Sequence, residues 1–118
     1  MQSFKFKLAV LSVALSAGTA FAQAQPVIGL ITKTETNPFF VKMKEGAQAE
    51  ATKLGAKLMT ASGAKDGDTA AQITAIENMT AAGAKTILIT SSGDAIIPAV
   101  KKAQAKGVQV IALDSPFD

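Results

Sequence analysis

The stretch Ala81-Ala-Gly-Ala-Lys-Thr-Ile-Leu-Ile-Thr90 passes from a helix-forming run, through a glycine, into a short β-branched run. Gly83 stands where helices commonly end in the left-handed conformation, and the apolar residues after it predict a strand over 86–90. The same pattern occurs at residues 53–58 and 105–110. The sequence therefore predicts three joints at which a helix passes into a strand.

Four short apolar runs are the predicted strands. They span residues 27–31, 56–60, 86–90 and 108–113, and the run over 56–60 is the weakest of them. Continuous apolar runs of this length are typical of parallel sheets that helices cover on both faces.

The segments between these strands show helical periodicity, because apolar residues recur at steps of three and four. The first helix is expected to bury Phe40, Met43, Ala47, Ala51 and Leu54. The second, capped by Asp66 or Asp68, is expected to bury Ile73, Ile76 and either Met79 or Thr80. The third, beginning near Asp94, is expected to bury Ile97, Val100 and Ala103.

The predicted elements alternate in the order β-α-β-α-β-α-β with short loops. Such alternation indicates an α/β fold with a doubly wound parallel sheet and right-handed crossovers. The chain ends at Asp118, in a loop just after the last predicted strand, with no helix to cover that strand. We therefore expect the domain to be truncated.

The first 22 residues have the pattern of a secretory signal peptide. Lys5 and Lys7 form a positive start, residues 8–17 are apolar, and Ala20-Phe-Ala22 offers the small residues that a signal peptidase recognises. The apolar run is too short to span a bilayer. We expect cleavage after Ala22 and export to the periplasm, which leaves residues 23–118 as an N-terminal lobe without a membrane span.

Composition excludes several classes of function. The sequence has no Cys, no His and no Arg, and the net charge of +3 falls to +1 without Lys5 and Lys7. Disulfides, soft metal ligands and nucleophile–base pairs that use Cys or His are therefore absent. Neither a basic patch with aromatic residues nor a glycine-rich phosphate-binding motif occurs. We expect no enzyme activity, no cofactor, no metal and no nucleic-acid partner.

Ligands of open parallel sheets bind beyond the carboxyl ends of the strands, so the loops there carry the candidate site. Asn37 can donate to and accept from a hydroxyl group, Phe39 and Phe40 offer flat faces to a sugar ring, and Asp114 can accept hydroxyl protons. Three of these four residues have a structural alternative: Asn37 could cap a helix or make an Asn-Pro turn, Phe40 could pack in the core, and Asp114 could belong to a turn. The same loops also carry the weaker candidates Thr36, Asp94 and Ser115. The loop at 63–68 holds two acidic residues and is interpreted as a solvated turn.

The motifs as a set resemble the ribose-binding type of periplasmic binding protein. They run in order and at matching spacing over the whole of residues 26–118, and comprise Val27-Ile-Gly-Leu-Ile31, Asn37-Pro-Phe-Phe40, Lys44-Glu-Gly-Ala47, Leu54-Gly55, Gln72-x-x-x-Ile76-Glu77, Ile89-Thr-Ser-Ser-Gly-Asp94, Pro98-Ala-Val-Lys-Lys-Ala103 and Val110-Ile-Ala-Leu-Asp114. The resemblance implies two doubly wound lobes that close on a monosaccharide by a hinge. It also implies docking on the permease of an ATP-driven (ABC) importer and, in some members, on a chemotaxis receptor.

The resemblance assigns roles to the candidate residues. It implies that Asn37 contacts sugar hydroxyls, that Phe39 and Phe40 sandwich the ring, and that Asp114 accepts hydroxyl hydrogen bonds. Ser115 stands where the ribose-binding pattern usually has Arg, and the form Leu113-Asp-Ser-Pro116 is more similar to fructose-binding relatives. A two-lobed protein needs about twice this length. We therefore expect the chain alone to fold marginally and to bind sugar poorly.

Three other classes of protein share parts of this pattern. The effector domain of a LacI-type sugar-responsive repressor has the same fold, but such a repressor begins with a helix-turn-helix, whereas residues 1–22 resemble a signal peptide. A response regulator or other flavodoxin-like domain would need clustered acids after the first strand, where Thr32-Lys-Thr34 stands. An enzyme on this fold is a further alternative, because a fold does not fix a function.

Overall fold

A computed structural model describes residues 24–117, so the predicted signal peptide lies outside the described residues. The elements follow in the order β1 (Val27–Thr32), α1 (Pro38–Leu54), β2 (Lys57–Ser62), α2 (Thr69–Ala81), β3 (Thr86–Ile89), the short 3₁₀ helix η1 (Asp94–Ile96), α3 (Ile97–Ala105) and β4 (Gln109–Ala112). This is the predicted alternation of strands and helices.

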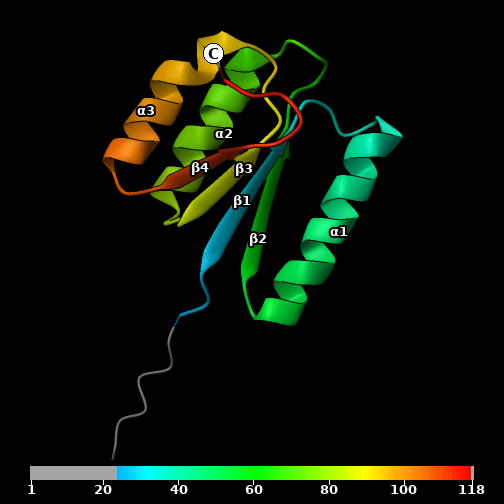
Figure 1. Cartoon of the computed structure of the whole chain (residues 1–118), viewed down its shortest axis with the longest axis vertical. Coiled ribbons are helices and arrows are strands. Elements are labelled where there is room, and N and C mark those ends of the chain that lie inside the picture. Colours follow the sequence, from blue (N-terminus) through cyan, green and yellow to red (C-terminus); the bar gives the residue numbers. More distant parts are fainter. Residues whose placement is uncertain (1–23, 118) are drawn as a thin grey trace, which may run out of the picture.

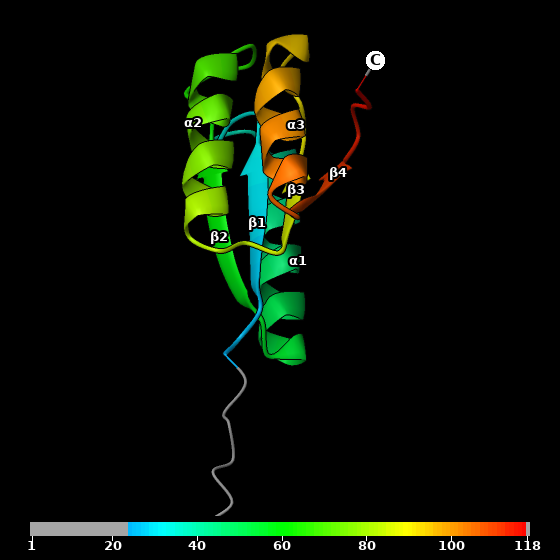
Figure 2. The same cartoon turned by 90° about the vertical axis from the view of Figure 1, so that its left-hand side faces the viewer.

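All four strands are parallel and are arranged in the order β2-β1-β3-β4. Helix α1 packs on β1 and β2 at one face of the sheet, whereas α2 and α3 lie side by side on the other face (Figures 1 and 2). From β1 the chain adds β2 on one side of the sheet and then β3 and β4 on the other side, so the order of addition reverses at β1. With right-handed crossovers, this change of side places helices on both faces. The predicted doubly wound α/β fold is confirmed.

The three predicted joints between helix and strand are present. Gly55, Gly83 and Gly107 have φ values of 70°, 85° and 87°, in the left-handed region that a side chain disfavours. At the start of α2 the carboxylate of Asp68, one of the two predicted caps, accepts a hydrogen bond from the N–H of Ala71 at 3.1 Å.

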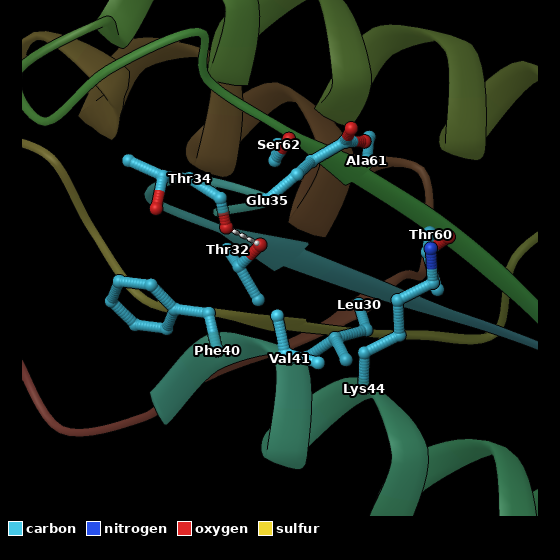
Figure 3. A pocket seen from close by; sticks show the side chains of 10 residues that line it. All are labelled: Leu30, Thr32, Thr34, Glu35, Phe40, Val41, Lys44, Thr60, Ala61 and Ser62. Atoms are coloured by element: carbon cyan, nitrogen blue, oxygen red, sulfur yellow. Dashed lines mark hydrogen bonds between the residues drawn. The ribbon is translucent and has the colours of Figure 1, made fainter. Parts of the chain in front are cut away.

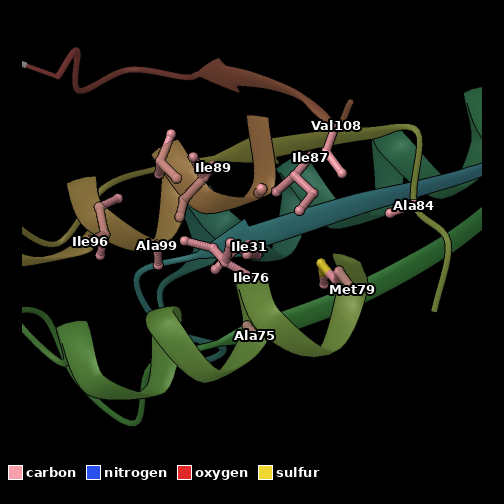
Figure 4. Packing of buried hydrophobic residues seen from close by; sticks show 12 residues of the cluster. Ile31, Ala75, Ile76, Met79, Ala84, Ile87, Ile89, Ile96, Ala99 and Val108 are labelled. Carbon is pink, nitrogen blue, oxygen red and sulfur yellow. The ribbon is translucent and has the colours of Figure 1, made fainter. Parts of the chain in front are cut away.

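The main core fills the space between the sheet and the pair α2 and α3 (Figure 4). Ile31, Ile87 and Ile89 from the strands meet Ile76 and Met79 of α2, and all of them are at most 2% exposed. A smaller apolar contact lies under α1, where Leu30 and Phe40 are buried. The core therefore forms from alternate faces of β1, as a sheet covered on both sides requires.

Among the predicted core positions one is exposed and four are only half-buried, the latter being Met43, Ala47, Ile73 and Ile97. Leu54 has the right helical phase, but it is the last residue of α1, where the chain turns at Gly55 into β2, and its side chain is 67% exposed. In the third helix Ile96 is fully buried and Ile97 only half-buried, because the chain enters α3 through the 3₁₀ helix η1. The tighter turn of a 3₁₀ helix shifts the angular position of the residues that follow.

Candidate functional site

The loops that follow the four strands gather at one end of the sheet, which is the upper end in Figure 1. Because all the strands are parallel, their carboxyl ends share that edge. Residues 33–37, 63–68, 90–93 and 113–117 form these loops. Every candidate residue from the sequence lies there, in one of these loops or in the first turn of the helix that follows.

Asn37 is exposed and begins α1 as its N-cap. Its side-chain oxygen accepts a hydrogen bond from the N–H of Phe39 at 3.0 Å, and its own N–H donates to Thr34 Oγ1 at 3.3 Å. The helix cap foreseen as an alternative is therefore present. Because the cap uses only the oxygen, the side-chain NH₂ group keeps two donors for a ligand.

The two phenylalanines differ in exposure. The side chain of Phe39 is 53% exposed, whereas that of Phe40 is 6% exposed and lies on the buried side of α1. Their ring centroids are 5.2 Å apart at an interplanar angle of 74°, an edge-to-face contact. The exposed ring of Phe39 is thus supported by the buried ring of Phe40.

A cavity of about 220 Å³ opens between α1 and the carboxyl ends of β1 and β2 (Figure 3). Its lining is mostly apolar near the helix and polar at the loops, and consists of Leu30, Thr32, Thr34, Glu35, Phe40, Val41, Lys44, Thr60, Ala61 and Ser62. Inside it Thr32 Oγ1 donates to the carbonyl oxygen of Thr34 at 3.0 Å. This bond fixes the first turn of the loop that leads to Asn37.

Asp114 follows β4 and has a φ of 63°, which makes it the one residue other than glycine with a positive φ among residues 24–117. Asp tolerates this left-handed region better than most residues, and such conformations are concentrated at functional sites. Its side chain is exposed, while Ser115 next to it is half-buried. A carboxylate held at the strand end in this way can accept hydrogen bonds from a ligand.

The weaker candidates Thr36 and Asp94 are both exposed. Thr36 borders a shallow pocket of about 410 Å³ between the loops after β1 and β2, and Asp94 opens η1. In the same pocket the carboxylate of Asp68 accepts hydrogen bonds from the N–H groups of Ala64 and Ala71, which lower the pKa of that carboxyl. Asp68 therefore serves the helix and the loop, in keeping with a solvated turn.

Gln72 of α2 is the functional candidate that the site analysis of the sequence missed. It is fully buried, and its amide bonds to the backbone at the ends of β1 and β3. Its position four residues before Ile76 puts it on the buried face of α2, but the periodicity gives no sign of the backbone groups that it meets there.

Among residues 24–117 no three acidic side chains lie close enough together to hold a metal ion. The helices of the same region are too short or too polar to cross a bilayer.

Comparison with known proteins identifies the family. The sequence profile of the periplasmic binding protein domain matches residues 28–118. The ribose import binding protein RbsB of Escherichia coli K12 is 39% identical over 116 residues, which cover 97% of this chain and 38% of that protein. The D-ribose/D-allose-binding protein of Pseudomonas aeruginosa is 35% identical over 107 residues, covering 88% of this chain and 34% of that protein.

A solved structure supports the same family. The ABC transporter periplasmic solute binding protein of Actinobacillus succinogenes, with bound D-allose, has a TM-score of 0.74 and 33% identity to this chain, covering 80% of this chain and 33% of the other. The chain thus spans about a third of the length of these relatives, each of which is named as a binding protein. The chain belongs to the family of periplasmic binding protein domains, as its resemblance to the ribose-binding type predicted.

Proposed function

We propose that this chain supplies one side of a monosaccharide site in the substrate-binding component of an ABC-type sugar importer. The observation that carries the proposal is the pairing of the free amide group of Asn37 with the exposed ring of Phe39 at the carboxyl end of the sheet. A sugar ring has hydroxyl groups that need donors and acceptors, and an apolar C–H face that stacks on an aromatic ring.

In this proposal each candidate residue has a distinct task. Asn37 donates to sugar hydroxyls, Phe39 covers the C–H face with support from Phe40, and Asp114 accepts hydroxyl protons from the other side of the loop cluster. Thr36, Asp94 and Ser115 border the site. The protein binds and releases the sugar without a cofactor and without changing it chemically.

The rest of the proposed function belongs to a complete two-lobed protein. A second lobe closes over the sugar and removes it from water, and the closed form delivers it to the importer permease in the periplasmic space. Chemotaxis receptors are a further partner of the closed form. The named relatives that bind ribose and allose support a pentose or hexose ligand. Ser115, which lacks the planar donors of Arg, favours a fructose-like sugar over ribose.

The test is a titration of the isotopically labelled chain with D-ribose, D-allose and D-fructose, followed through the backbone amide signals. We expect shifts confined to the loops that carry Asn37, Phe39 and Asp114, with weak affinity because one side of the site leaves most of the sugar in water. L-Serine is the control ligand and should shift nothing. Shifts confined to residues outside these loops, or none with any of the sugars, would refute the proposal.

A further inference from the structure

Gln72 uses its whole side-chain amide to hold the backbone at the ligand end of the sheet. Its Nε2 donates to the carbonyl oxygen of Thr32 at 3.3 Å and to that of Thr90 at 2.9 Å. Its Oε1 accepts from the N–H of Ser92 at 2.9 Å. The three partners belong to the last residue of β1 and to the loop that follows β3, and none lies on α2 itself.

These bonds are placed where the ladder of the sheet stops. Thr32 is the last residue of β1 and Thr90 comes directly after β3, so their carbonyl groups point past the last regular pairs. Buried backbone groups need partners: Gln72 donates to both carbonyl oxygens, and that of Thr32 also accepts from the N–H of Gly63 at 3.3 Å. The amide therefore bridges two strand ends that are also joined directly, by the N–H of Thr90 and the carbonyl oxygen of Ile31 at 2.9 Å.

The three hydrogen bonds of Gln72 to Thr32, Thr90 and Ser92 are called the clamp below. Both loops that begin at these bonds carry candidate residues. The segment after Thr32 leads to Asn37, and the segment after Ser92 leads to Asp94. The side-chain hydroxyl of Ser92 is buried and has no hydrogen-bond partner among the described residues. Ser92 is thus bonded to Gln72 through its backbone N–H, while the hydroxyl of the neighbouring Ser91 bonds to the backbone of Gly93 in the same loop.

Packing alone does not call for an amide at this position. The other buried residues of α2 are apolar, namely Ala75, Ile76 and Met79. A buried amide is unfavourable unless all its groups are bonded. We propose that Gln72 is a positioning residue for sugar binding, which fixes the geometry of the loops after β1 and β3 without touching the ligand. This inference rests on the proposed function.

The experiment compares Gln72→Met and Gln72→Glu with the unchanged chain. Met fills a similar volume without any hydrogen bond. A buried Glu is held in its neutral form and can still donate one bond and accept one. Gln48→Met on the exposed face of α1 is the matched control. Each variant is titrated with D-ribose, D-allose and D-fructose, and amide hydrogen exchange is measured without sugar.

For Gln72→Met we expect the sugar dissociation constant to rise about tenfold, with faster exchange and shifted signals at Ser92 and in the loop after β1. Exchange at Leu58 and Val110, in the outer strands, should stay as it is. For Gln72→Glu the dissociation constant and the exchange rate at Ser92 should lie between those of Gln72→Met and the unchanged chain. Gln48→Met should change neither quantity.

Unchanged sugar affinity in Gln72→Met overturns the inference, as does an equal rise in exchange over the whole sheet, which indicates a general loss of stability. If the unchanged chain binds no sugar, the proposed function fails. The clamp is then judged by exchange alone: a selective effect at Ser92 upholds the positioning of the loops, and its absence overturns it.

Discussion

The side-chain oxygen of Asn37 accepts a hydrogen bond from the backbone N–H of Phe39 at 3.0 Å. One residue thus begins helix α1 and presents its NH₂ group at the proposed sugar site. The cap also determines where the exposed ring of Phe39 stands, because it fixes the first turn of the helix that carries this ring. The structural role and the proposed binding role of Asn37, which look like alternatives in the sequence, are thus compatible in a single side chain.

Substitution at position 37 should separate these two roles. Asn37→Asp keeps a good N-cap but loses the amide donors, so stability should change by no more than about 0.5 kcal/mol while sugar binding weakens. Asn37→Ala loses both, and unfolding should become easier by about 1 kcal/mol. Urea unfolding and sugar titration of the two variants check this. Equal sugar affinity in Asn37→Asp and the unchanged chain would remove Asn37 from the site.

Asp114 should matter through its charge. In a form of the protein that carries both lobes, Asp114→Ala should weaken sugar binding by about 2–5 kcal/mol, well over tenfold, because a charged partner of the ligand is lost. Asp114→Asn is the matched control for the backbone, since Asn also tolerates the left-handed conformation with φ 63° found here. The Asp114→Asn variant should unfold at the same temperature as the unchanged protein and should still bind the sugar more weakly in calorimetry. Full affinity in both variants would show that the carboxylate does not touch the sugar.

Two glycines should respond in opposite directions to alanine. A Cβ on Gly63 would lie 2.7 Å from the carbonyl oxygen of Lys33 and 3.0 Å from that of Lys65, both of them backbone atoms. Gly63→Ala should therefore destabilise the fold by about 1–3 kcal/mol. Gly46 lies inside α1 with open space around it, so Gly46→Ala should stabilise the fold by about 0.5–1 kcal/mol. Thermal unfolding measures both, and a stable Gly63→Ala protein would contradict the close approach of the two loops.

The N-cap Asp68 should make stability depend on acid pH. Hydrogen bonds from the N–H groups of Ala64 and Ala71 lower the pKa of its carboxyl in the folded protein. The charged form therefore stabilises the fold above the ordinary pKa of about 3.9, and this contribution is lost as the pH falls through the lowered value. Asp68→Asn can still cap α2 but cannot titrate. Urea midpoints measured from about pH 5 to pH 2 should fall less in Asp68→Asn than in the unchanged chain.

Cleavage after Ala22 is a prediction about residues outside the described region. Mass spectrometry of a periplasmic extract should find a protein that begins at or near Gln23. An intact Met1 on protein in the cytoplasm would contradict the predicted export.

The sequence predicts the fold well because its signals are local. Gly55, Gly83 and Gly107 mark the helix ends through a conformation that glycine adopts readily, and the apolar runs after them need no distant partner to be recognised. The errors arise where the burial of a side chain depends on the structure next to it. Periodicity cannot show that η1 shifts the phase and buries Ile96 in place of Ile97, or that Leu54 is left in solvent at a helix end.

The candidate site is predicted less completely for the same reason. The loops after parallel strands indicate where Asn37, Phe39 and Asp114 gather, but they do not indicate which phenylalanine is exposed. Gln72 looks like an ordinary polar helix residue until the ends of β1 and β3 are brought to its side chain. Its role depends on contacts between residues 18 and 40 positions apart, and such contacts leave no local pattern.

The place of β1 in the sheet has a consequence for the order of folding. β1 is made first, yet its neighbours arrive much later, since Val27 pairs with Lys57 and Ile28 pairs with Thr86. Parallel pairs cannot form through a tight hairpin, and closing long loops slows folding. A growing chain therefore has no sheet until β2 has been made, and β1 has one free edge until β3 follows. During synthesis this delay keeps the domain unfolded, and an unfolded chain can be threaded through a translocation pore.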